Sequence, residues 1–249
     1  MLATLRQEGC LKARFPRVHG DAAEVITVNL SGGVAGGDQL AVQVSLGAGA
    51  RATISGQAAE RFYRALPGSP PSRVRTGLAV AEGGSFEWLP QESILFDRCA
   101  LDRSLDVDLA EDACFLGVES LVFGRAAMGE AVEHVNLRDL IRVRRRGELL
   151  LHDAIRLRGS AREVLARRAT GAGMRAFATL VLARPNADLL LDPLREALAG
   201  RPAEAGVSAW NGLLMARLAA PTGINLRTAL AAALAELRGG RSLPRAWAC

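Results

Sequence analysis

The feature that most constrains this chain is a glycine-rich run at residues 29–38, which reads NLSGGVAGGD. Apolar and polar residues alternate before it, at 24–30, and after it, at 40–46. Alternation of this period is typical of strands that bury one face, so the run forms a turn between two strands. Glycine suits such a turn because it reaches positive φ without steric cost and lets another backbone approach closely.

Four glycines of this turn are expected to be structural, namely Gly32, Gly33, Gly36 and Gly37. Asp38 closes the turn, where its carboxylate can accept hydrogen bonds from nearby backbone N–H groups. The run does not fit a nucleotide-binding loop. A P-loop needs a lysine after its last glycine, and a dinucleotide loop opens a helix, whereas a strand pattern follows here.

Short alternating segments continue to about residue 157, separated by turns rich in glycine and proline. We expect a hairpin turn at Gly83-Gly84 and another at residues 146–148. Residues 57–66 form either a short helix or an extended segment.

The last third of the chain changes character. It holds a compact apolar run at 176–183 and a core strand at 210–218, with two amphipathic helical patterns at 189–198 and 226–237. We therefore predict a single domain over residues 1–249 that is mainly β. Many short strands stack in a sandwich, barrel-like or helical arrangement, and two α-helices lie in the C-terminal third.

Composition narrows the function. The net charge is +5, and the basic residues are almost all arginine, with Lys12 as the only lysine. Nucleic-acid binding is not expected, because neither interleaved aromatics nor a known module accompanies the charge. No secretory signal and no membrane-length apolar run is present, so we expect a soluble cytoplasmic protein without membrane contact.

Histidine and cysteine give no metal-binding pattern. The three histidines and four cysteines lie far apart, and none stands at chelating spacing from another. A hydrolase is also disfavoured, since no serine lies in a G-x-S-x-G elbow. We do not expect an enzyme.

Several motifs run in order along nearly the whole chain. They are residues 9–17 (GCLKARFPR), 31–38 (SGGVAGGD), 57–64 (QAAERFYR), 88–97 (WLPQESILFD), 124–130 (GRAAMGE), 211–217 (NGLLMAR) and 243–247 (LPRAW). Together they resemble the urease accessory protein UreD family, called UreH in some organisms. One departure is Ser55-Gly56, which stands where the family usually has a threonine pair.

The resemblance implies a scaffold or chaperone for assembly of the urease nickel centre. Its partners would be the urease apoprotein and UreF, and through UreF the GTPase UreG. Nickel would bind in transit, with no tightly bound cofactor. The family fold is a mostly β stack of strands with two α-helices. The alternatives are a generic β-rich interaction module without a metal role and, less favoured, a hydrolase.

In or beside the motifs, seven acidic residues are candidates for a weak nickel passage: Asp38, Glu60, Glu87, Glu92, Asp97, Glu119 and Glu130. Oxygen ligands suit a carrier that must release its cargo, because tight nickel sites favour imidazole or thiolate ligands. Candidates for partner contact are Arg61, Tyr63, Arg64, Arg245 and Trp247. Aromatic residues and arginine dominate interfaces once buried.

Overall fold

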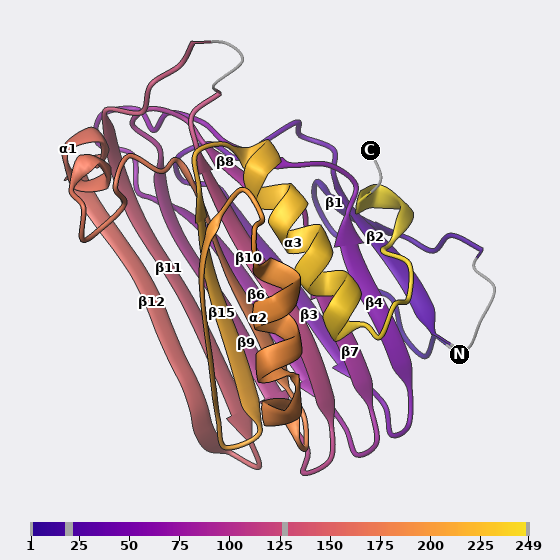
Figure 1. Ribbon diagram of the computed structural model, residues 1–249. Coiled ribbons are helices and arrows are strands. Elements are labelled where there is room, and N and C mark those ends of the chain that lie inside the picture. Colours follow the sequence, from indigo (N-terminus) through magenta and orange to yellow (C-terminus); the bar gives the residue numbers. More distant parts are fainter. Residues whose placement is uncertain (1, 18–21, 126–128, 248–249) are drawn as a thin grey trace.

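The computed structural model describes residues 2–17, 22–125 and 129–247, which form two stacked β-sheets and a layer of helices (Figure 1). The larger sheet has the order β1 (Leu11–Arg14), β2 (Ala23–Asn29), β4 (Arg51–Gly56), β7 (Ser85–Leu89), β10 (Cys114–Phe123), β13 (Ala176–Ala183), β15 (Leu213–Ala220) and β14 (Glu204–Trp210). Beside β10 it also contains β8 (Ser93–Leu95) and β5 (Glu60–Phe62). The smaller sheet has the order β12 (Glu148–Ser160), β11 (His134–Arg145), β9 (Ala100–Leu109), β6 (Ser72–Val80) and β3 (Gln39–Leu46). The prediction of a mainly β, stacked fold is confirmed.

From β2 to β11 the chain winds as a coil that supplies strands to both sheets. Strands β2, β4, β7 and β10 pair in parallel in one sheet, and β3, β6, β9 and β11 pair in parallel in the other. The hairpin expected at Gly83-Gly84 is therefore wrong, because this turn leads from β6 in one sheet to β7 in the other. Alternating apolar and polar residues predict a strand with one buried face, but they do not predict which other strand it pairs with. The hairpin at residues 146–148 is confirmed by the antiparallel β11–β12 pair.

The C-terminal third matches the sequence in most elements. The strand at 176–183 and both helices, α2 (Leu191–Leu198) and α3 (Gly223–Leu237), are present. The core strand expected at 210–218 is wrong in its start, since Asn211 and Gly212 form a turn with φ of 46° and 71° between β14 and β15. One further short helix, α1 (Ala161–Ala166), begins at Ser160, whose side chain accepts a hydrogen bond from the Glu163 N–H.

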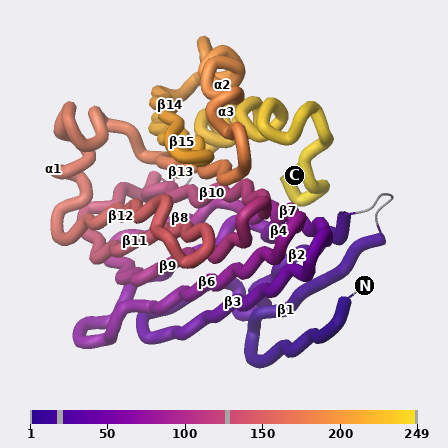
Figure 2. Tube along the Cα trace, turned by 90° about the horizontal axis from the view of Figure 1, so that it is seen from below, coloured from indigo at the N-terminus to yellow at the C-terminus, as the bar shows by residue number. Residues whose placement is uncertain are grey.

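Figure 2 shows α2 and α3 on one face of the larger sheet and the smaller sheet on the other. Strand β13 is therefore buried on both faces: Leu180 and Leu182 pack against the helices, and Val181 faces the smaller sheet. This double burial explains why residues 176–183 read as a continuous apolar run. Among the described residues, no helix is long and apolar enough to span a bilayer.

The C-terminal segment is anchored to the helical face of the sheet. Trp247 is 7% exposed, and its Nε1 donates to the Leu89 carbonyl at 3.0 Å. The Arg227 guanidinium lies 5.3 Å from the centre of the Trp247 ring and donates to its carbonyl oxygen at 2.6 Å. Trp247 thus holds the end of the chain against the core.

The glycine run connects β2 to β3 and is constrained at several positions. Gly32, Gly33 and Gly37 have φ of 77°, 148° and 90°, whereas Gly36 is not among the positive-φ residues. Gly36 is limited instead by a neighbour, because a Cβ there would lie 3.0 Å from the Ala65 Cβ. The Asp38 carboxylate accepts from the Ala35 N–H at 2.8 Å and so closes the turn.

Gly33 is expected to be the position least tolerant of substitution in this run. A Cβ at Gly33 would lie 2.3 Å from Cε2 of Tyr63, whereas Gly68, with φ of 81°, faces open space. Gly68→Ala should cost about 1 kcal/mol from its backbone conformation alone, and Gly33→Ala about 2–3 kcal/mol. Urea unfolding measures both values. Equal losses in the two variants would contradict the role of the Tyr63 contact.

Candidate functional site

A layer of polar side chains crosses the space between the two sheets and divides the apolar core. We call it the polar layer, and it consists of Ser93, Arg103, Glu119, Asp139, Asp153, Thr179 and Arg217. On the side of the glycine run lies an apolar cluster that includes Val34, Phe62, Leu95, Leu101 and Leu137. On the other side lies a second cluster that includes Leu78, Leu105, Val107, Phe115 and Val143.

Strand register brings the polar layer together. In the larger sheet Glu119 pairs with Thr179, and Thr179 pairs with Arg217. In the smaller sheet Arg103 pairs with Asp139. Neighbouring residues in register on adjacent strands share a face. One polar row of each sheet therefore points into the sandwich, and the two rows meet.

Arg103 is the centre of the polar layer. Its guanidinium lies 2.6 Å from a Glu119 oxygen and 2.6 Å from an Asp139 oxygen, and it also donates to Ser93 Oγ at 2.8 Å. The side chains of all three charged residues are at most 8% exposed. Such buried ion pairs are costly to desolvate, so replacing them with apolar residues of similar size is often neutral or stabilising.

Two buried carboxylates thus share one guanidinium. Burial raises the pKa of Glu119, while the Arg103 charge lowers it and the Asp139 charge raises it again, with a net rise. The indole Nε1 of Trp88 donates to the other Glu119 oxygen at 2.9 Å. Burial therefore disfavours the negative charge of Glu119 despite the neighbouring guanidinium.

At the other edge of the sandwich the polar layer ends in a second ion pair. Asp153 on β12 is buried and binds Arg217 on β15, which is itself exposed. The Thr179 hydroxyl lies 3.4 Å from the other Asp153 oxygen. This contact joins the two sheets at the side where β12 faces β15.

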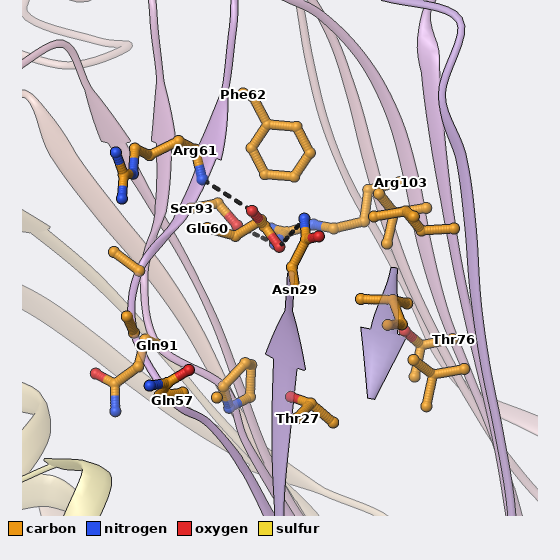
Figure 3. Close-up of a pocket in the computed structure, with 18 of the residues that line it drawn as sticks. Thr27, Asn29, Gln57, Glu60, Arg61, Phe62, Thr76, Gln91, Ser93 and Arg103 are labelled. Carbon is orange, nitrogen blue, oxygen red and sulfur yellow. Dashed lines mark hydrogen bonds between the residues drawn. The ribbon is translucent and has the colours of Figure 1, made fainter. Parts of the chain in front are cut away.

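A cavity of about 370 Å³ reaches the polar layer from the edge formed by β2, β3 and β5. Its inner part is lined by Trp88, Ser93, Arg103 and Glu119. Figure 3 shows Glu60 at this cavity, with Arg103 and Ser93 drawn in the same view. The cavity thus presents two carboxylates, those of Glu60 and Glu119.

Glu60 is held at this cavity by neutral donors. The amide of Asn29 donates to one oxygen at 3.1 Å, and the Arg61 N–H donates to the other at 3.2 Å. Burial raises the pKa of Glu60 above its ordinary value, although these two hydrogen bonds and the Arg61 charge lower it in part. No ion pair joins the Glu60 carboxylate to a cation within 2–17, 22–125 and 129–247, so no cationic group within ion-pair distance compensates its partly buried negative charge.

A second cavity, of about 260 Å³, borders the opposite part of the polar layer. Its lining includes the apolar side chains of Leu121, Phe123 and Phe177, and its polar lining consists of Arg156, Thr170, Thr179 and Arg217. Helix α1 contributes Val164 and Leu165. The polar layer is therefore bordered by one cavity near Arg103 and by another near Arg217.

The structure places two of the seven predicted acidic residues, Glu60 and Glu119, at the first cavity. The carboxylate of Glu87 lies on the helical side, 3.0 Å from Arg238 and 2.6 Å from Arg241. Burial would raise the pKa of Glu87, but the hydrogen bonds from Arg238 and Thr53 and the two arginine charges lower it overall.

The other four acidic residues have local partners. The Glu92 carboxylate lies 3.5 Å from Arg227, and Glu130 lies 2.8 Å from Arg125. Asp97 accepts from the N–H groups of residues 133 and 134 at 2.9 Å each, and Asp38 closes the glycine turn. None of these four, nor Glu87, lines either cavity in the described part of the chain.

The five predicted partner residues are spread over two regions. Arg61 and Arg64 are exposed, and Arg61 lines the first cavity. Tyr63 packs edge-on against Phe96 and donates to the Gly32 carbonyl at 2.8 Å. Arg245 is exposed beside the buried Trp247, at the opposite end of the chain. Trp247 offers little surface to a partner because it is packed against the core.

Sequence reasoning missed Arg103, Asp139, Asp153 and Arg217. The signal was present, since Arg103, Asp139 and Asp153 occupy inward positions of strands that otherwise alternate apolar and polar residues. A charge at such a position must find a buried partner. Within the described ranges, no group of three or more His, Cys, Asp or Glu residues is arranged to hold a metal ion.

Comparison with known proteins identifies the family. A family model described as UreD urease accessory protein matches residues 1–248. The chain belongs to the UreD family. A protein of Sinorhizobium medicae named "Urease accessory protein UreD" is 45% identical over 249 residues, which are 99% of this chain and 89% of that protein. A Dinoroseobacter shibae protein of the same name is 46% identical over 246 residues, which are 99% of this chain and 85% of the relative.

In this UreD-family chain, Glu60→Gln should stabilise the fold at neutral pH. Because burial raises the pKa of Glu60, the folded state binds its proton more tightly, and stability falls as pH rises from the ordinary value of 4.5 through the folded pKa. Glutamine removes that loss and keeps an acceptor for Asn29. The variant should unfold at a higher urea concentration than wild type at pH 7, and the difference should vanish below pH 4.5.

The matched control is Glu111→Gln, which removes an exposed carboxylate 3.1 Å from Arg146. Exposed pairs contribute at most about 1 kcal/mol, so its effect at pH 7 should be small and of opposite sign. A Glu60→Gln variant less stable than wild type at pH 7 would show that the ionised carboxylate stabilises the fold.

Proposed function

We propose that this chain is an accessory protein of urease maturation that guides nickel through its sandwich while holding the urease apoprotein and UreF, with UreG reached through UreF. Family membership and the names of the relatives support the urease role. The observation that carries the nickel role is the polar layer, which two cavities border from different sides.

The donor set suits a cation that must move on. Glu60 and Glu119 supply carboxylate oxygens, which hold divalent nickel less tightly than imidazole or thiolate ligands do. Glu60 has only neutral donors at its carboxylate, so an arriving cation would relieve the cost of its buried charge. Glu119 lies deeper, beside Arg103.

Arg103 would control cation binding at the deeper carboxylates, those of Glu119 and Asp139. Its charge neutralises Glu119 and Asp139 when no cation is near. A divalent cation that approaches these carboxylates competes with the guanidinium, and Ser93 remains as a second acceptor for the displaced N–H. The same exchange at Asp153 and Arg217 would serve the other edge. The route is thus closed by ion pairs when it is empty.

The partner contacts belong to the rim of this route. Arg61 and Arg64 are both exposed, and Arg61 lines the first cavity. We assign them to the surface where a partner hands over or receives the cation. Arginine is enriched at interfaces because its guanidinium binds carboxylates in two places at once.

The test is a Glu60→Gln/Glu119→Gln double variant, with Glu111→Gln as the control. We expect the double variant to form the complex with apo-urease and UreF on a sizing column, and to leave the matured urease with much less nickel than wild type. Nickel per urease, measured by mass spectrometry of the metal, decides the outcome. An intact complex that delivers nickel at the wild-type level would favour the interaction module without a metal role.

A further inference from the structure

The outer face of the smaller sheet is open. Figure 2 shows the helices on the far side of the larger sheet, and in the described part of the chain no helix covers the outer face of β3, β6, β9, β11 and β12. The side chains that point away from the sandwich on these strands are therefore at the surface or packed only against each other. This face lies outside the polar layer and the first cavity, and it shares one residue, Arg156 at the β12 edge, with the lining of the second cavity.

The open face carries most of the net charge of the molecule. Its outward positions hold seven arginines, Arg73, Arg75, Arg138, Arg142, Arg144, Arg156 and Arg158, and three aspartates, Asp102, Asp106 and Asp108. The difference, 7 − 3, is +4, against +5 for the whole chain. The positive charge is thus concentrated on one sheet face.

The aspartates orient the arginines around them. Asp102 on β9 lies 2.6 Å from Arg75 on β6 and 3.2 Å from Arg138 on β11. Asp106 is four residues further along β9 and points to the same face. It lies 2.5 Å from Arg142 and 3.8 Å from Arg144. Each carboxylate is shared by two guanidiniums, so a positive charge remains at each cluster. Side chains held in this way lose less entropy when a partner binds.

Three arginines of the face remain available. Arg73, Arg156 and Arg158 are exposed, and no ion pair involves them within the described residues. Arg73 and Arg156 lie in the same register row as Asp102, at the two sides of the Arg138 cluster. Free guanidiniums therefore flank the oriented ones.

Several outward side chains between the charges are small. Small side chains occupy other outward positions: Ala41, Gly77, Ala79, Ser104 and Ala154. Ser104 and Leu140 are only 4% and 3% exposed although no helix covers them in the described part of the chain, so longer side chains of the same face shield them. The result is a positively charged surface on which four guanidiniums, those of Arg75, Arg138, Arg142 and Arg144, are held by aspartates.

We infer that this face docks the acidic surface of a protein partner. Arginine recognises carboxylates through paired N–H donors, and complementary charge speeds and orients association. The interleaved aspartates fit a protein surface of mixed charge and would repel a continuous phosphate backbone. No Phe, Tyr or Trp that could stack on bases stands at these outward positions, and the only rings on this face are the imidazoles of His134 and His152. The inference rests on the proposed function for its probes, which are purified apo-urease and UreF.

The test compares two triple variants with the same loss of charge. The face variant carries Arg73→Gln, Arg156→Gln and Arg158→Gln. The control carries Arg167→Gln, Arg168→Gln and Arg201→Gln, three exposed arginines outside this face. We expect the face variant to bind apo-urease or UreF about tenfold more weakly than wild type, and the control to remain within about twofold.

Salt gives a second measurement that needs no variant. Raising it from about 50 to about 300 mM should weaken the wild-type interaction about tenfold, and the face variant should show a smaller slope. Equal affinities of the two triple variants, or a salt-independent wild-type affinity, would overturn the docking face. So would a face variant that loses only binding to duplex DNA or anionic vesicles. A wild-type chain that binds neither apo-urease nor UreF would contradict the proposed function as well. This outcome distinguishes failure of the proposed function from failure of the docking face alone.

Discussion

The fold is organised around one buried guanidinium. Arg103 on β9 binds Glu119 on β10 and Asp139 on β11, so its contacts join both sheets at the middle of the sandwich. Without the carboxylates, its charge would be too costly to bury. Without Arg103, two carboxylates would face each other in the core. Loss of one member alone would therefore leave an uncompensated charge between the two apolar clusters.

The position of the triad connects structure to function. Apolar residues of similar size in place of the triad would often give an equally stable core. A layer of charge between two apolar clusters therefore suggests a functional role. Two cavities end at this layer, one near Arg103 and one near Arg217. We therefore propose that the polar layer is a hydrophilic path for a cation through the sandwich, while the apolar clusters on both sides of it hold the two sheets together.

The sequence predicts the local elements well because alternation and apolar periodicity are local. It places the strand at 176–183 and both C-terminal helices, and it fails where pairing is long-range, as at Gly83-Gly84. The same limit applies to the site. Arg103 and Asp139 are 36 residues apart, and only the parallel register of β9 and β11 sets them side by side. Glu60 and Glu119 were found through their motifs, but their shared cavity comes from the winding of the chain.

The central claim is that the polar layer is kept for transport and not for stability. A triple variant, Arg103→Met/Glu119→Leu/Asp139→Leu, replaces the triad with apolar side chains of similar size. Its free energy of unfolding should match or exceed that of wild type by about 1–4 kcal/mol. The decisive measurement is the nickel content of urease matured with this variant in a complex that forms normally. We predict urease with little nickel, and nickel at the wild-type level would contradict the account.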